Sequence, residues 1–394
     1  MQLDTRRSGT VLALGTAQTL AWASSYYLPA VLAQPMAVAV GLQGAHVFAM
    51  FSAALLLAAL IGPLAGRQID RHGGRPVLAL SNLGFAAGLA LMALSEQPAS
   101  LMLAWALMGL AMGAGLYEAA FATLVHLHRQ DARGMITGIT LIAGFASTVG
   151  WPLSSWLAVQ WGWREACWTW AALHLLLGLP LNLSLPRRGA AAPASPPGGS
   201  AAPAQEARGG QGRAMLALAL VFALNGFIAT AMAAHGPRLL QALGLGMTAA
   251  VAVAALIGPA QVAARLFEFG ALRRVHPLQS ARLATLAHPL GGLALLLLGA
   301  PAGLAFGLLH GMGNGLLTIS KGALPLVMFG AQGYGQRQAL LLAPGRVLQA
   351  LAPWLFGLAL ERWQGQALWL STGLGLLALL VLLRMRPHSS SPSA

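Results

Sequence analysis

Apolar segments long enough to cross a lipid bilayer follow one another through most of this 394-residue chain. A membrane-spanning helix needs about 20 predominantly apolar residues. Twelve segments near that length cover residues 10–33, 44–65, 76–95, 100–125, 135–158, 166–185, 214–235, 247–267, 281–299, 302–321, 338–360 and 366–384. Only 8% of the residues are charged, against about 25% in soluble domains. We therefore predict an all-α membrane protein with twelve transmembrane helices.

Residues 186–213 differ in composition from the sequence on either side, because Pro, Ala, Gly and Ser predominate and no apolar periodicity is present. This composition predicts a flexible cytoplasmic linker. The linker divides the chain into residues 1–185 and 214–386, each with six predicted helices. The polar residues 387–394 predict a disordered tail.

Glycine patterns recur in the two halves of the chain. Gly62-Pro63 in the second helix is matched by Gly258-Pro259 in the eighth. Three glycines of the fourth helix recur 198 positions later in the tenth: Gly109, Gly113 and Gly115 are matched by Gly307, Gly311 and Gly313. Matches in register indicate a duplicated unit, as in transporters built from two related halves. We expect two pseudo-symmetric six-helix bundles. Gly84-x-x-x-Gly88 and Gly109-x-x-x-Gly113 should serve close helix packing, and Gly311-x-Gly313-Asn314-Gly315 predicts a bend in the tenth helix.

The distribution of Lys and Arg predicts the orientation of the chain, because cytoplasmic loops of membrane proteins carry an excess of positive charge. With the N-terminus inside, most basic residues fall on the inner side, and Arg265 and Lys321 are counted with the inner loops. Only Arg164, Arg238 and Arg362 fall on the outer side. We therefore expect a multi-pass protein of the inner (plasma) membrane with both termini in the cytoplasm.

One short loop between the second and third predicted helices combines glycine, charge and a sharp turn, in the order Gly66-x-x-x-Asp70-Arg71-x-Gly73-x-Arg75. Gly66 permits close approach of another helix, and Asp70 suits the positive N-terminal end of a neighbouring helix. The two arginines hold the loop on the cytoplasmic side. Alternatively, this is an ordinary basic loop that only sets topology.

This loop resembles the signature between helices two and three of the major facilitator superfamily, with Gln68 where leucine is common and Gly74 where an arginine is common. Gly162-Trp163-Arg164 after helix five resembles a second motif of that family. Trp105 stands where many members carry an arginine in helix four. The resemblance implies two six-helix bundles that move a solute by alternating access, with the signature loop as a gate. It also implies that helices one, four, seven and ten line a central cavity.

Glu118 is the only carboxylate well inside a predicted helix, and ionisable groups there are costly. We expect it to be buried, which disfavours its charged form. It would then load and unload a proton for transport, or contact the solute. The alternative is a structural partner for an arginine or a polar group of a helix.

Arg346 lies about eight residues, or ~12 Å, from the inner end of the eleventh predicted helix. Its guanidinium suits an anionic group of a solute. It could instead pair with Glu118 across the two halves and help to close the inner side. A third interpretation is a side chain that extends to the inner membrane surface.

The remaining site candidates are polar side chains on helices that the resemblance places around the cavity, namely Tyr26, Asn225, His310 and Asn314. Tyr26 and Tyr27 also fit anchors at the outer membrane surface. His235, His288 and His310 lie in or near helices and titrate close to physiological pH. A lone membrane histidine is more often a hydrogen-bond partner between helices.

Several functional classes are excluded by what the chain lacks. It has no Gly-x-x-x-x-Gly-Lys-Ser/Thr phosphate loop and no His-Glu-x-x-His metal motif. Cys167 is the only cysteine, so neither an intrachain disulfide nor a cysteine metal cluster is possible. The net charge of +14 lies in short loops between apolar helices, which argues against nucleic acid as a partner. We expect neither an enzyme nor a cofactor.

The sequence thus favours a secondary transporter of a small organic solute, with an organic anion among the candidate classes. We expect it to be a monomer in the bilayer, to be coupled to protons, and to export its solute rather than import it. The alternative is a transporter-like membrane sensor or scaffold that binds a ligand without moving it.

Overall fold

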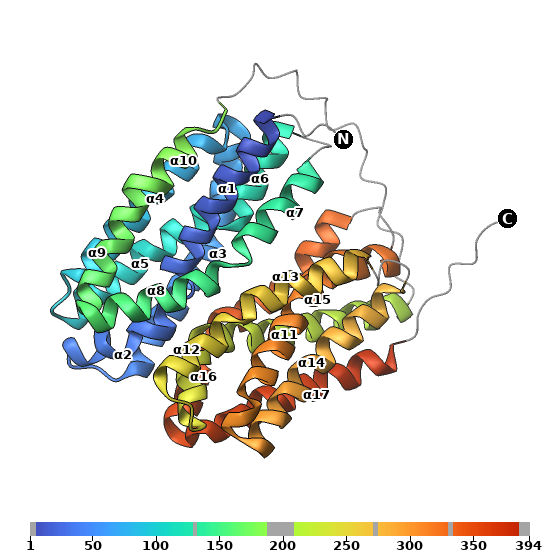
Figure 1. Cartoon of the computed structure of the whole chain (residues 1–394). Helices are drawn as coiled ribbons and strands as arrows, with labels where there is room; N and C mark the ends of the chain where they lie inside the picture. Colours follow the sequence, from blue (N-terminus) through green and yellow to red (C-terminus); the bar gives the residue numbers. More distant parts are fainter. Residues whose placement is uncertain (1–4, 129–131, 187–208, 271–274, 330–333, 386–394) are drawn as a thin grey trace.

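The computed structural model of the chain describes residues 5–128, 132–186, 209–270, 275–329 and 334–385. Within these residues no strand is present and the regular elements are all helical, which confirms the all-α class. The helices form two bundles that lie side by side (Figure 1). Residues 187–208 of the predicted linker and the tail 387–394 lie outside the described residues, whereas 209–213 already belong to a helix.

The first bundle contains α1 (Thr5–Ser24), α2 (Pro29–Ala39), α3 (Gly44–His72), α4 (Gly74–Ala93), α5 (Pro98–Gly115), α6 (Tyr117–His128), α7 (Ala132–Ala143), α8 (Ala146–Gln160), α9 (Trp163–Leu173) and α10 (Leu179–Leu183). The second contains α11 (Gly209–Ala242), α12 (Met247–Ala255), α13 (Ile257–Gly270), α14 (Pro277–Leu298), α15 (Gly303–Phe329), α16 (Tyr334–Trp363) and α17 (Leu368–Arg384). Along the chain, residues 187–208 fall between the last helix of the first bundle and the first helix of the second.

Nine stretches of the described residues are long and apolar enough to span a membrane. One of them, Leu341–Arg384, contains most of α16 and all of α17 and so corresponds to two predicted crossings. The predicted crossings 10–33 and 135–158 are not among the nine, and each is divided into two helices. Each of the twelve predicted segments therefore corresponds to one helix or to a pair of consecutive helices.

Equivalent glycines make the same contact in both bundles. A Cβ atom on Gly109 of α5 would lie 2.6 Å from a carbonyl oxygen of α3, and one on Gly307 of α15 would lie 2.8 Å from a carbonyl oxygen of α12. Gly113 and Gly311 repeat this close approach about one turn further on, at 2.7 Å and 2.6 Å. Only glycine lets these helix backbones approach so closely. The packing role predicted for Gly109 and Gly113 is confirmed, and the same contact at Gly307 and Gly311 supports a duplicated unit.

The turn between α3 and α4 depends on two adjacent glycines. Gly73 has φ +81° and ψ 162°, a conformation that is essentially restricted to glycine. A Cβ atom on Gly74 would collide with the side chain of Thr123. Nothing lies within 4 Å of the Cβ position of Gly66, so the predicted close approach at Gly66 is wrong for this conformation. The side chain of Asp70 lies outside the described residues.

The two bundles meet along α3 and α16, at the end of the molecule away from the chain termini (Figure 1). The backbone N–H of Ala45 donates to Glu361 Oε1 at 2.9 Å. Further along, the N–H of Trp354 donates to Ser52 Oγ at 3.2 Å. We call this contact the α3–α16 seam. It closes one end of the space between the bundles.

Candidate functional site

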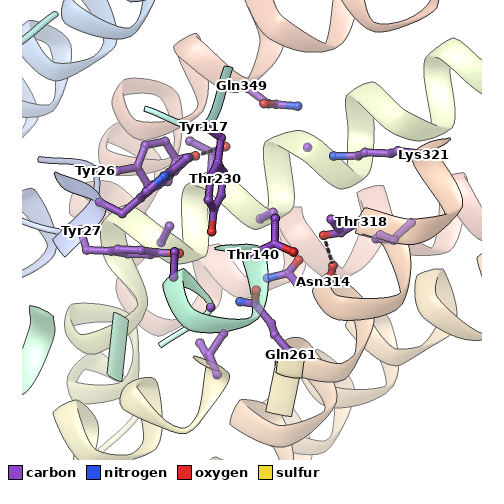
Figure 2. A pocket seen from close by; sticks show the side chains of 18 of the residues that line it. Tyr26, Tyr27, Tyr117, Thr140, Thr230, Gln261, Asn314, Thr318, Lys321 and Gln349 are labelled. Carbon is purple, nitrogen blue, oxygen red and sulfur yellow. Dashed lines mark hydrogen bonds between the residues drawn. The ribbon is translucent and has the colours of Figure 1, made fainter. Parts of the chain in front are cut away.

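A cavity of about 310 Å³ lies between the two bundles and has walls from both (Figure 2). It is lined by Trp22, Tyr26, Tyr27, Tyr117, Phe121, Thr140, Ala143, Gly144, Trp151, Asn225, Gly226, Ala229, Thr230, Ala233, Ile257, Gln261, Arg265, His310, Asn314, Leu317, Thr318, Lys321 and Gln349. Its volume is at the lower end of the range of about 300–1,000 Å³ that is usual for small-molecule sites.

Breaks between consecutive helices border this cavity. Tyr26 and Tyr27 lie between α1 and α2, Tyr117 opens α6, Gly144 lies between α7 and α8, and Ile257 opens α13. Non-helical backbone at membrane depth is tolerated where it lines a cavity or is buried in protein. Discontinuous helices are also a common feature of transporter binding sites. The breaks therefore make this cavity the candidate functional site.

The first bundle contributes an aromatic wall, consisting of Trp22, Tyr26, Tyr27, Tyr117 and Trp151. Ring centroids lie 4.9 Å apart for Trp22–Tyr26 and 4.8 Å apart for Trp22–Tyr117. The centroids of Tyr27 and Trp151 are 5.3 Å apart and the rings meet edge to face. These separations are typical of favourable aromatic pairs. The wall therefore offers rigid, largely apolar faces with a few hydroxyl groups.

The second bundle contributes a polar wall. Its residues recur every three or four positions on one face of α15 and every four on α13, and they are His310, Asn314, Thr318 and Lys321 with Gln261 and Arg265. Figure 2 shows Lys321 extending from α15 toward the aromatic side chains. No Asp or Glu lines the cavity in the part of the chain that the structure describes. The two cations thus give this wall a positive charge.

Arg265 connects the two bundles through neutral acceptors. Its Nη1 donates to the carbonyl oxygen of Thr140 in α7 at 2.9 Å. Its Nη2 donates to the hydroxyl of Thr318 in α15 at 3.4 Å. The Nε atom is buried and has no hydrogen-bond partner. The guanidinium is therefore held at the cavity without a neutralising carboxylate.

Tyr26, Asn225, His310 and Asn314 all line the cavity, as the resemblance implied. The Tyr26 hydroxyl donates to Thr230 Oγ1 at 2.7 Å, so this tyrosine joins the two bundles and is not an anchor at the outer surface. Asn225 Nδ2 donates to Thr285 Oγ1 at 3.3 Å. What these four residues do in transport stays a prediction.

Two of the histidines form a buried pair behind the polar wall. The Nδ1 atoms of His288 in α14 and His310 in α15 are 3.1 Å apart. Gly313 allows this approach, because its Cβ position lies 3.0 Å from the His288 ring. By contrast, the ring of His235 lies 3.8 Å from that of Phe48 in α3, and its Nε2 is 2.7 Å from the carbonyl oxygen of Pro353. His235 therefore packs near the α3–α16 seam.

Glu118 and Arg346 form an ion pair across the bundles, with Glu118 Oε1 2.9 Å from Arg346 Nη2. Their side chains are 64% and 49% exposed, respectively, and neither lines the cavity. The expected burial of Glu118 is therefore wrong, because α6 directs it into the open space beside α3. The pairing itself was one of the arrangements that the sequence allowed. An Arg346 already paired with a carboxylate is a weaker candidate for binding an anionic solute.

Arg265 and Lys321 were counted with the inner loops because they fall among the last residues of the predicted helices 247–267 and 302–321. Counting them as loop charges is wrong. α13 continues to Gly270 and α15 to Phe329, so both residues lie within helices that line the cavity. Lys321 is eight residues, or ~12 Å, from the end of α15. The apolar run after Lys321 was the signal that could have shown this helix to continue.

Two bundles of apolar, membrane-length helices around a shared cavity define a multi-pass membrane protein of the transporter type. Residues 14–306 match the sequence model of the Major Facilitator Superfamily. The chain therefore belongs to this family of membrane transporters, as its signature loop indicated.

Solved structures agree in fold. The nucleoside transporter NupG is 15% identical, with a TM-score of 0.74 over 97% of this chain and 100% of that one. A bacterial homolog of the human lysosomal transporter Spinster, in an inward-facing and occupied conformation, is 16% identical, with a TM-score of 0.69 over 96% and 97% of the two chains. At these identities the likeness shows the fold alone.

Curated relatives match over a shorter segment. The multidrug resistance protein MdtH of Yersinia pestis (strain Pestoides F) is 36% identical over 118 residues. The same segment of MdtH from Yersinia pseudotuberculosis serotype O:1b (strain IP 31758) gives the same identity. The match spans 29% of this chain and 29% of the relative.

Proposed function

We propose that the protein is a secondary transporter that moves a small organic solute across the inner membrane by alternating access. The observation that most supports this is the cavity, with its aromatic wall on one bundle and its polar wall on the other. A site shared by two bundles changes its access when the bundles rock about it. A solute bound to both walls is then exposed to one side of the membrane at a time.

The conformation is inward-facing in this proposal, because cytoplasmic termini place the α3–α16 seam on the outer side. The Glu118–Arg346 pair lies about 12 Å further in along α16 than Trp354. Rocking toward the outward-facing state closes the inner side, where the space beside Gly66 leaves room for the opposite bundle. The gate in that state consists of Gly66, Asp70, Arg71, Gly73 and Arg75.

Proton coupling is assigned to the His288–His310 pair. His310 lines the cavity and its ring contacts His288, so a proton on this pair is close enough to affect a bound solute. Imidazole changes charge close to physiological pH, which suits a carrier of single protons. Glu118 is the second candidate, since its ion pair with Arg346 joins the two bundles.

Export is the proposed direction, and the partial match to multidrug resistance proteins supports it. A duplicated chain that encloses its own cavity needs no second copy to complete the site. The protein therefore works as a monomer.

The test uses proteoliposomes that contain the full-length protein, a pH-sensitive dye and an imposed proton gradient. Pools of organic anions, cations and neutral solutes are compared for wild type, His310→Asn and Glu118→Gln, with His46→Asn as the control because His46 is exposed in the first turn of α3. We expect solute-dependent proton movement that is lost in His310→Asn and retained in the control.

The other results separate the alternatives. Loss in Glu118→Gln alone would assign the proton to Glu118 instead. Solute exchange with no proton movement would contradict coupling and leave a uniporter or exchanger. Binding of solutes with no flux in wild type would contradict transport and favour the sensor or scaffold.

A further inference from the structure

We infer that the solute is an organic anion, whose anionic group binds between Arg265 and Lys321 while its apolar or aromatic body packs on the aromatic wall. This inference rests on the proposed transport function and specifies the chemical class of the solute. It moves the anion site from Arg346, which the sequence favoured, to two cations at the ends of predicted helices that the sequence analysis counted with the inner loops.

Charge is the first argument. The cavity has two cationic side chains, from α13 and α15, and none of its described lining residues is acidic. Burying a cation is costly unless charge or hydrogen bonds compensate it. Both acceptors of Arg265 are neutral oxygens, and its Nε atom is buried without a partner. An anion supplies the compensation that this guanidinium lacks.

Geometry is the second argument. Arg265 Nη2 reaches Thr318 Oγ1, and Lys321 lies three positions after Thr318 on the same face of α15. Both cations therefore border the cavity from neighbouring positions of the polar wall, and an anion in the cavity can approach each of them. The amides of Gln261, Asn314 and Gln349 line the same cavity and can donate further hydrogen bonds (Figure 2). Carboxylate, sulfonate and phosphate groups are all suited to such a cluster.

The aromatic wall limits the shape and polarity of the rest of the solute. Tyr26, Tyr27 and Tyr117 lie across the cavity from Lys321 (Figure 2). Their ring faces favour a flat apolar body, and Tyr26 already uses its hydroxyl proton on Thr230. A cavity of about 310 Å³ holds a compact solute with one or two rings. An amphipathic organic acid satisfies both walls at once.

Arg346 lacks these features. A carboxylate oxygen of Glu118 lies 2.9 Å away, half of the side chain is exposed, and the residue is outside the cavity lining. Its charge is already compensated and screened by water. The two arginines therefore have different roles, Arg265 toward the solute and Arg346 toward the opposite bundle.

The inference is tested by calorimetric titration of the purified full-length protein with three probes of one shape, naphthalene-2-carboxylate, naphthalene-2-carboxamide and naphthalen-2-ylmethylammonium. We expect the carboxylate to bind at least tenfold more tightly than the amide, and the amine to bind most weakly. Arg265→Gln and Lys321→Gln should each reduce the carboxylate preference at least fivefold. Arg265→Lys should keep most of it, because the charge remains. Arg362→Gln, an exposed arginine at the far end of α16, should leave it unchanged.

Three results would overturn the assignment: no detectable binding of the carboxylate, equal affinity for the three probes, or a preference that survives in both glutamine variants. If Arg265→Gln elutes as aggregated protein in size-exclusion chromatography, the carboxylate preference of Lys321→Gln alone decides whether the anion site is correct. The proteoliposome flux assay that tests the proposed function is interpreted independently of this binding assay. Solute flux without carboxylate preference refutes this inference and leaves transport standing, whereas selective binding without flux refutes transport and leaves the anion site.

Discussion

Breaking the Glu118–Arg346 ion pair should shift the protein away from the conformation described here by a small and calculable factor. The pair joins the bundles at 2.9 Å, but its side chains are 64% and 49% exposed. Two unit charges 4 Å apart in water attract by about 1 kcal/mol, and exposed pairs contribute about 0.2–1 kcal/mol. A tenfold change corresponds to about 1.4 kcal/mol, so removing the pair changes the ratio of the two states by about 1.4- to 5-fold.

Ala45→Cys reports the minor state, because Ala45 is 3% exposed within the α3–α16 seam. The cysteine reacts with a maleimide only when the seam opens, so its rate follows the population of the other state. The natural Cys167 is fully buried and contributes little background. We expect the rate to rise about 1.4- to 5-fold in Glu118→Gln and in Arg346→Gln, with no further rise in the double variant.

Glu165→Gln is the matched control, since Glu165 is an exposed acidic residue on α9 away from the seam. Raising the salt to about 1 M should remove most of the difference between wild type and the single variants. Unchanged rates in both single variants, or fully additive effects in the double variant, would refute a stabilising pair. A rise of more than about 30-fold, equivalent to about 2 kcal/mol, would refute the assumption that water screens the pair.

Three further predictions concern packing, backbone and protons. Gly113→Leu should lower the free energy of unfolding by about 1–3 kcal/mol, because a Cβ atom at this position would lie 2.7 Å from a carbonyl oxygen of α3. Thermal unfolding measures the loss, with Gly66→Leu as the control because nothing lies within 4 Å of the Cβ position of Gly66. Gly73→Ala should cost about 1–3 kcal/mol in the same assay, since φ is +81° there, and an unchanged Tm would contradict this. His288→Asn should abolish solute-driven proton movement in proteoliposomes while solute counterflow continues, and equal loss of both would indicate a structural histidine.

The sequence was sufficient for the parts of the fold that repeat. Helix positions follow from apolar length, and the packing glycines follow from recurrence at a fixed spacing, as Gly109 and Gly307 illustrate. Four predicted site residues also line the cavity, because the family resemblance specified which helices face inward. These features depend on local composition and on an internal comparison, both of which a single sequence contains.

The charged part of the site could not be placed in this way. A helix end is uncertain by several residues, and this uncertainty decided whether Arg265 and Lys321 were loop or cavity residues. The close approach at the α3–α4 turn falls on Gly74, whereas Gly66 is open, since the contact depends on where Thr123 of α6 lies. The burial of Glu118 depends on which conformation is populated. Each of these outcomes is set by tertiary arrangement, which spacing alone does not encode.

The placement of charge gives the two arginines of the second bundle different energetic roles. Arg346 is compensated by Glu118 within the protein, so its pairing changes with conformation and not with solute. Arg265 has only neutral acceptors, and the cavity that it shares with Lys321 has no acidic residue among its described walls. A cation in the interior of a membrane protein is costly until an anion or a polar group compensates it. Anion binding should therefore stabilise the folded protein, by about 2.7 kcal/mol at one hundred times the Kd, and Arg265→Gln should remove most of that gain while making the ligand-free protein no less stable.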